Sequence, residues 1–228
     1  MKRFAALVVI MAGVFGLQAC TEIRETPAEG TARVLDLSAD TVENFIRLPR
    51  LKEFTKHLPQ ARALMIMPAI VKAGFIVGGE GGTGVLIARQ ASGGWGYPAF
   101  YTIGAASIGF QFGIQDVETI LVIRNEGALK SIIKNQGKLG TDIGVTAGFV
   151  GAGMEASTTT NLRFDVLAFT NAKVGAYAGA SLEGGVVARR RDFNEAFYGR
   201  GATPEAIVLE GRYKNPQADK LRSVLARF

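Results

Sequence analysis

Cysteine and histidine are almost absent from this chain, which has one of each among its 228 residues. A disulfide within the chain needs two cysteines and a zinc site needs several Cys or His ligands, so neither is available. A histidine-dependent triad could use only His57, which we expect to be a solvated residue at a helix end. Charge is also scarce, since charged residues make up 20% of the chain against 48% hydrophobic ones. This composition excludes a disordered chain and predicts one folded core.

The only long hydrophobic run is at the start of the chain and is too short to span a membrane. It covers residues 4–17 after two basic residues, and a membrane-spanning helix needs ~20. Such a run is typical of a secretory signal peptide. It ends in LQAC, residues 17–20, which resembles the bacterial lipobox. We therefore predict that residues 1–19 are a lipoprotein signal peptide and that Cys20 carries a lipid anchor, the alternative being an ordinary signal with an incidental cysteine.

The segment after the cysteine is polar. Residues 20–37 are predicted to be the lipidated cysteine and a tether, because Thr21 to Asp36 show no apolar period. In lipoproteins of this kind an Asp after the cysteine retains the protein at the inner membrane, and Thr21 does not meet that requirement. We therefore expect a lipid-anchored protein of the bacterial outer membrane that faces the periplasm, with its domain in residues 38–228.

Besides a short helix between Pro49 and Pro59, with Leu51, Phe54 and Leu58 on one face, three helices are predicted in that domain. Ser38 is a suitable N-cap for the first, whose apolar face holds Val42, Phe45 and Ile46. That face could pack on the domain or insert into a membrane, and the sequence leaves both open. A second helix is expected over residues 125–135. A third follows Asn215, which is a suitable cap, with Pro216 at the first helical position.

Glycine is abundant, and 23 of the 29 glycines lie between Gly74 and Gly185, among β-branched and aromatic residues. This pattern predicts strands near 62–67, 73–78, 84–90, 97–103, 106–114, 118–124, 141–149, 161–169, 173–180 and 184–190. The fold class expected is α+β, mostly β: a meandering antiparallel sheet that forms a sandwich or a partly closed barrel, flanked by N- and C-terminal helices. In 107–114 and 174–180 one strand face is nearly free of side chains. Such a face lets a helix, another sheet or an acyl chain approach the backbone.

Motifs for catalysis are weak. Residues 79–84 have the spacing of a dinucleotide fingerprint, but a strand follows where a helix would be needed, so we expect a hairpin turn. Ser107 and Ser181 lie in near-matches to a nucleophile elbow that each lack one glycine and have no evident base. The sequence therefore predicts no catalytic residue, no metal ligand and no cofactor.

Basic residues are more informative, and the formal net charge is +6. Arg189, Arg190 and Arg191 close the last predicted strand, and Lys72 is placed at a turn before the strand that starts near Gly74. Guanidinium groups suit phosphate oxygens, so these four residues are candidates for a lipid headgroup. The alternative is a solvated charge cluster balanced by Asp192 and Glu195. No nucleic-acid partner is expected, because no basic and aromatic module is recognisable.

Five blocks of the chain resemble the SYLF domain family and together span roughly residues 40–190. They are Val71–Leu86, Trp95 with Pro98–Tyr101, Ser107–Gly113, Leu139–Asp142 and Gly175–Gly184. The resemblance implies a lipid-binding module whose eukaryotic members bind phosphoinositides and are linked to actin assembly. It also implies lipid contact through the helix after Ser38 and through Lys72.

The function expected is a membrane-anchored envelope lipoprotein whose domain binds phospholipid or another anionic amphiphile without catalysis. A structural role at the outer membrane, in which the domain docks an unknown protein partner, is the main alternative. A hydrolase of envelope lipids or glycan is a third hypothesis, and it requires folding to bring two carboxylates, or a serine and a base, into one cleft.

Overall fold

A computed structural model describes residues 25–74, 77–108, 113–134, 137–138, 147–150, 165–174 and 185–228. The predicted signal peptide, Cys20 and Ser181 lie outside these residues. So do most of the two strand faces predicted to lack side chains, in 107–114 and 174–180.

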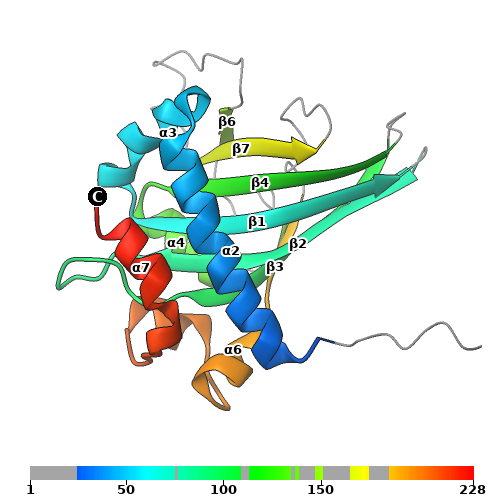
Figure 1. Ribbon diagram of the computed structural model, residues 1–228. Helices are drawn as coiled ribbons and strands as arrows, with labels where there is room; N and C mark the ends of the chain where they lie inside the picture. The colour runs from blue at the N-terminus through cyan, green and yellow to red at the C-terminus, as the bar shows by residue number, and fades with distance from the viewer. Residues whose placement is uncertain are drawn as a thin grey trace, which may run out of the picture.

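The described strands form one eight-stranded sheet with the order β5-β8-β3-β2-β1-β4-β7-β6. Their bounds are β1 Ala63–Gly74, β2 Val77–Ala88, β3 Ala99–Ile108, β4 Gly113–Ile123, β5 Gly137–Lys138, β6 Ala147–Val150, β7 Val166–Val174 and β8 Val186–Arg189. The pair β6–β7 is parallel and the other neighbours are antiparallel. The sheet is strongly twisted (Figure 1), and among the described residues its two edge strands, β5 and β6, do not pair with each other. The predicted α+β class with an antiparallel sheet and flanking helices is confirmed.

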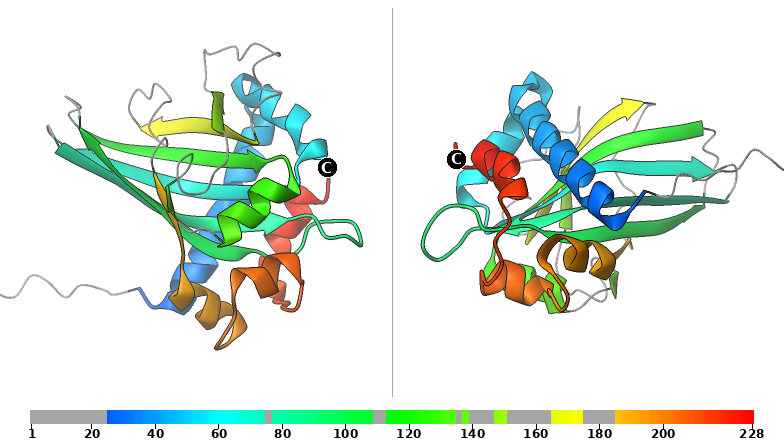
Figure 2. Two further views of the ribbon diagram at one scale, coloured as in Figure 1. Left: turned by 180° about the vertical axis from the view of Figure 1, so that it is seen from behind. Right: turned by 60° about the horizontal axis from the view of Figure 1, so that its bottom comes forward.

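Helices lie on both faces of the sheet and make two cores. One face is covered by α2 Pro27–Arg47, α3 Lys52–His57, α6 Arg191–Tyr198 and α7 Asp219–Leu225, and α2 runs diagonally across β1 and β2 (Figure 1). The opposite face is covered by α4 Glu126–Lys134 and by a π-helical turn, η4 Glu205–Leu209 (Figure 2). Strand residues alternate between the cores, as Leu64 and Ile66 face α2 while Met65 and Met67 face α4.

Helix α2 begins eleven residues before the predicted cap. Thr26 and Glu29 form a reciprocal capping box, and Pro27 occupies the first turn. Val34 and Leu35 are buried, so residues 27–37 belong to the domain, and their assignment to a tether was wrong. Ser38 lies inside the helix with no exposed surface. The prediction failed because Gly30 and Thr31 also pack in this half of the helix, so Val34 and Leu35 are left without a full apolar stripe.

The glycine run at 79–84 is part of strand β2 rather than a hairpin turn. A Cβ at Gly82 or Gly84 would overlap the carbonyl oxygens of Ala69 and Ile66 on the neighbouring strand. The pairing of β1 with β2 changes register between Ile66 and Val71, which marks a bulge. These glycines therefore let an irregular β1 lie close to β2. Strand β1 continues through the bulge to Gly74. It therefore contains the strand predicted at 62–67 and the first part of the one predicted at 73–78, whose last two residues belong to β2.

Two predicted helices are confirmed. Helix α4 buries Leu129, Ile132 and Ile133, as its spacing predicted. At the C-terminus the Asn215 side chain accepts a hydrogen bond from the Gln217 N–H and caps a short 3-10 turn, η5 Pro216–Ala218, that leads into α7. Helix α6 was not predicted.

Candidate functional site

The three consecutive arginines do not form one cluster. Strand β8 ends at Arg189, which pairs in register with Tyr101, a core residue on the α4 side. Arg190 turns to the α2 side, where its guanidinium lies 3.7 Å from the centre of the Phe193 ring and donates to the Thr83 Oγ1 at 3.0 Å. Arg191 is the first residue of α6. Alternation at the strand end therefore directs the side chains apart.

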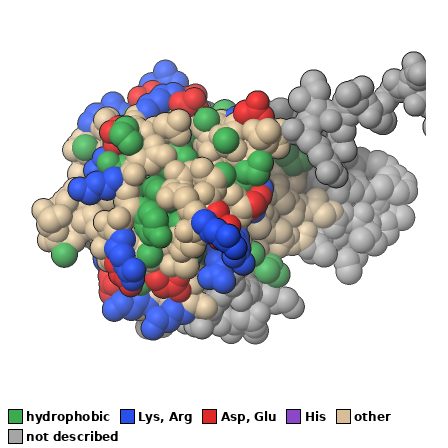
Figure 3. Space-filling view, turned by 90° about the horizontal axis from the view of Figure 1, so that it is seen from below, with side chains coloured by type: hydrophobic (Ala, Val, Ile, Leu, Met, Phe, Trp, Pro, Cys, Tyr) green, Lys and Arg blue, Asp and Glu red, His purple; other side chains and the backbone are tan. Residues whose placement is uncertain are grey.

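Acidic neighbours balance two of these arginines. Arg190 makes two hydrogen bonds to the Asp192 carboxylate, at 2.9 and 2.7 Å, and these bonds hold the pKa of Asp192 below its usual value. Arg191 donates to Glu195 at 3.1 Å and likewise lowers its pKa. The Arg191 side chain is 76% exposed, so this pair contributes little to stability. Basic side chains on the underside of the molecule are likewise gathered in separate groups around apolar and uncharged atoms (Figure 3).

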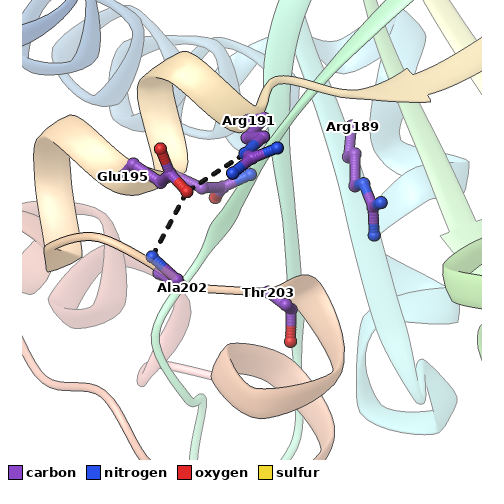
Figure 4. Close-up of a pocket in the computed structure, with 7 residues that line it drawn as sticks. Arg189, Arg191, Glu195, Ala202 and Thr203 are labelled. Carbon is purple, nitrogen blue, oxygen red and sulfur yellow. Dashed lines mark hydrogen bonds and ion pairs between the residues drawn. The ribbon is translucent and has the colours of Figure 1, made fainter.

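A cavity of about 130 Å³ lies between the end of β8, the start of α6 and the segment that follows α6. It is lined by Arg189, Arg191, Asn194, Glu195, Gly201, Ala202 and Thr203. Glu195 lies on one side, where it accepts from Arg191 and from the Gly201 N–H at 3.2 Å, and Arg189 lies on the opposite side (Figure 4). Two arginines against one glutamate leave the lining with a formal charge of +1, which favours a small anionic group on the Arg189 side.

Asn194 fixes this region to the sheet. Its side chain is fully buried, accepts from the Phe100 N–H at 2.8 Å, and donates to the carbonyl oxygens of Phe100 and Arg190 at 3.0 and 2.9 Å. It thus continues the hydrogen bonding of β3 past the end of β8. The positions of Arg191 and Glu195, on the same helix, depend on this attachment.

Lys72 does not join the arginines. It lies in β1, opposite Glu80 of β2, rather than at a turn, and its side chain is outside the described residues. Glu80 in turn pairs with Ala105, four residues along β3 from Tyr101, the partner of Arg189. Two strands and about four residues therefore separate the Lys72 position from Arg189.

The apolar face of α2 is used in the core. Val42 and Phe45 are fully buried among the residues between α2 and the sheet, and Ile46 packs against that cluster. Phe45 and Phe54 meet edge to face with ring centres 5.4 Å apart. In the folded domain these three residues therefore attach α2 to the sheet.

A buried carboxylate joins α2 to the sheet and was not foreseen. Glu118 of β4 is 1% exposed and accepts from the Thr41 hydroxyl at 3.1 Å, the Asn44 amide at 3.2 Å and the Asn171 amide at 2.6 Å. No local signal in the sequence could find this group, because its donors are 53 to 77 residues away along the chain.

The described part of the chain lacks the cluster of ligands that a metal centre needs. No group of three or more His, Cys, Asp or Glu side chains among those residues could hold a metal ion. His57 is not solvated as predicted: its side chain is 18% exposed beside Phe169, and burial lowers its pKa. Burial raises the pKa of the Tyr101 phenol, which stays neutral. None of the described helices is long and apolar enough to cross a membrane.

Comparison with known proteins identifies relatives for most of the chain. A family model described as "Ysc84: Las17-binding protein actin regulator" matches residues 104–228. Protein YSC84 of Saccharomyces cerevisiae is 34% identical over 172 residues, which are 74% of this chain and 36% of the yeast protein. SH3 domain-containing YSC84-like protein 1 of Homo sapiens is 30% identical over 173 residues, 75% of this chain and 50% of the human protein. The chain spans about a third to a half of the length of these relatives.

Proposed function

This chain belongs to the Ysc84 family of SYLF-domain proteins, and we propose that its domain binds phospholipid or another anionic amphiphile without catalysing a reaction. The headgroup lies at the arginine segment, residues 189–191. The observation that carries this proposal is the cavity in which Arg189 and Arg191 outnumber the single acidic side chain, Glu195.

The local chemistry suits a phosphate ester. Planar guanidinium groups donate paired hydrogen bonds to phosphate oxygens, and Thr203 in the lining offers a hydroxyl. Glu195 already accepts from Arg191 and the Gly201 N–H, so the carboxylate is held away from Arg189. An anion in the cavity would therefore lie between the guanidinium groups of Arg189 and Arg191, on the side away from the Glu195 carboxylate.

We further propose that the protein is a lipoprotein anchored through Cys20 in the bacterial outer membrane, facing the periplasm. The support is the order of basic residues, apolar run and lipobox-like motif in residues 1–20. Helix α2 begins at Pro27, so the linker between the anchor and the domain is about six residues. With so short a linker, the domain lies close to the membrane surface.

Vesicle binding tests the headgroup site. The chain with Cys20→Ser, which removes the proposed anchor, is incubated with phosphatidylglycerol vesicles and with phosphatidylcholine vesicles. We expect the protein to bind the anionic vesicles only. The double substitution Arg189→Gln with Arg191→Gln should weaken this binding roughly tenfold, and the loss of affinity should be larger at low salt. The control, Arg33→Gln with Arg47→Gln, removes the same charge from exposed positions of α2. Equal weakening by both pairs would show that only net charge matters.

A protein-docking role is the second candidate, favoured by the name of the matching family, which describes Las17 binding. If the Cys20→Ser chain binds neither kind of vesicle, this second function replaces the first. Native mass spectrometry of the same chain purified from bacteria then distinguishes the two directly, because a carrier domain retains phospholipid and a docking domain does not.

A further inference from the structure

One row of residues crosses the sheet on the face that carries α2, but beyond the region that α2 covers. In register, Val186 of β8 lies opposite Gly104 of β3, which lies opposite Gly81 of β2, and Gly81 lies opposite Val71 of β1. Val85 and Ile87 of β2 contact the α2 core, so strand alternation places Gly81 on that same face. Figure 1 shows that the sheet extends past α2 at this end.

This row is open and apolar. The exposed large hydrophobic side chains in the described part of the protein are Val71, 46% exposed, and Val186, 43% exposed. Between them, a Cβ at Gly81 would approach only the Ile103 carbonyl oxygen at 3.5 Å, and one at Gly104 only the Glu80 carbonyl oxygen at 3.8 Å. A Cβ at the exposed neighbour Gly79 would meet nothing within 4 Å. We call this feature the glycine furrow, with walls Val71 and Val186 and a floor of Gly79, Gly81 and Gly104.

The width of the furrow suits hydrocarbon chains. Neighbouring strands lie about 4.8 Å apart, and three spacings separate β1 from β8, so the backbones under the two valines are about 14 Å apart. This leaves room between the valine side chains for chains that lie flat on the glycine backbone.

The floor favours hydrocarbon over a peptide. Strand β2 is hydrogen-bonded to β1 and β3, and β3 to β2 and β8, so the ladders occupy the backbone groups around Gly81 and Gly104. A peptide laid on this floor would bury amide groups without partners, which is unfavourable. An acyl chain has no such groups to satisfy and gains from contact with Val71 and Val186.

Charge orients an anionic amphiphile in the furrow. Thr83 is the next residue after Gly81 on the same face of β2, and its hydroxyl oxygen accepts a hydrogen bond from Arg190. This arginine therefore lies at the β8 side of the furrow floor. Residues 189–200 carry four arginines against Asp192 and Glu195, a formal charge of +2. At the other side, beyond Val71, the register places Asp116. The net positive charge of residues 189–200 therefore attracts a negative headgroup toward the β8 side of the furrow, and Asp116 repels it from the β4 side.

We propose that the glycine furrow holds the acyl chains of an anionic phospholipid whose headgroup lies beyond Val186, toward the arginine segment, residues 189–191. This inference rests on the proposed lipid-binding function and adds a defined site for the hydrocarbon.

Chain-length dependence tests the furrow. The Cys20→Ser chain is titrated with soluble phosphatidylglycerols that carry two hexanoyl or two octanoyl chains, below their micelle concentrations. The wild-type furrow should bind the longer lipid at least tenfold more tightly, because more methylene groups are buried. In Gly81→Val with Gly104→Val, whose side chains fill the floor, we expect this gain to disappear. The exposed-loop variant Ser92→Val, at the other end of β2, should retain it.

A second variant guards against misfolding of the first. Val71→Ser with Val186→Ser adds no volume and should reduce the gain with chain length, while circular dichroism verifies the fold of each variant. If the octanoyl lipid binds more tightly than the hexanoyl lipid by the same factor in all folded variants, the furrow is not the acyl-chain site. The proposal that the domain binds the headgroup would be unaffected. Failure of the unmodified furrow to bind either phosphatidylglycerol would overturn the proposed function and the furrow together.

Discussion

Replacement of Asn194 by alanine should detach α6 from the sheet. The Asn194 side chain makes three hydrogen bonds in a fully buried position. The Phe100 carbonyl oxygen keeps a second partner, the Arg190 N–H at 2.9 Å. The Phe100 N–H donates to the Asn194 side chain, so the substitution leaves this buried donor unsatisfied.

The magnitude follows from these contacts. Loss of three neutral hydrogen bonds, one of which leaves an unpaired buried donor, lowers the free energy of unfolding by about 2–4 kcal/mol. For a protein of this size, each 1 kcal/mol lowers the midpoint of thermal unfolding by about 2–4 °C. We therefore expect the midpoint of Asn194→Ala to fall by roughly 4–16 °C.

Thermal unfolding followed by circular dichroism measures this change, and hydrogen exchange of the α6 amides locates it. The control is Asn125→Ala, which removes an exposed asparagine that caps α4 through the Ala128 N–H at 2.8 Å. That change should lower stability by only about 1 kcal/mol. A fall of less than 2 °C for Asn194→Ala, or unchanged exchange in α6, would refute the attachment role.

Three further results are expected. Glu118→Ala strands three buried side-chain donors and should lower the free energy of unfolding by about 3 kcal/mol or more in urea, whereas Glu118→Gln keeps one acceptor and should lower it less. The folded pKa of His57 lies below its unfolded value near 6.5, so its contribution to the free energy of unfolding is present above that pH and is lost as pH falls toward the folded value. In His57→Gln, the free energy of unfolding measured in urea should therefore depend less steeply on pH in this range. An unchanged pH dependence would contradict this. Gly84→Ala should lower the midpoint of thermal unfolding strongly, whereas Gly79→Ala should leave it nearly unchanged.

The sequence predicted those elements whose signal is local. Helix α4 has an apolar stripe, and the C-terminal helix has a capping asparagine followed by proline, so both were found. The first half of α2 and helix α6 were missed together because they are each other's partners. A Cβ at Gly30 would overlap the ring of Phe193, so α2 packs there through a glycine instead of an apolar side chain. Close packing of this kind depends on two segments more than 160 residues apart.

The candidate site shows the same limit. Adjacency of Arg189, Arg190 and Arg191 in the sequence predicted one cluster, but a strand end followed by a helix start separates their side chains. Proximity of Asp192 and Glu195 correctly indicated which acidic residues balance them. Asn194 carries no sequence signal for its role, since its partners are backbone groups of a strand 94 residues earlier.

The glycine run of β2 shows how one motif can serve two physical purposes. Gly82 and Gly84 are required because the irregular β1 strand passes where their side chains would be, which is a matter of folding. Gly79 and Gly81 meet no such obstacle and form the floor of the furrow, where space above the backbone is what matters. Larger residues at Gly79 and Gly81 would raise strand propensity at no steric cost, so strand formation does not require glycine there. Close packing of the strands therefore explains Gly82 and Gly84, and the proposed furrow would account for Gly79 and Gly81.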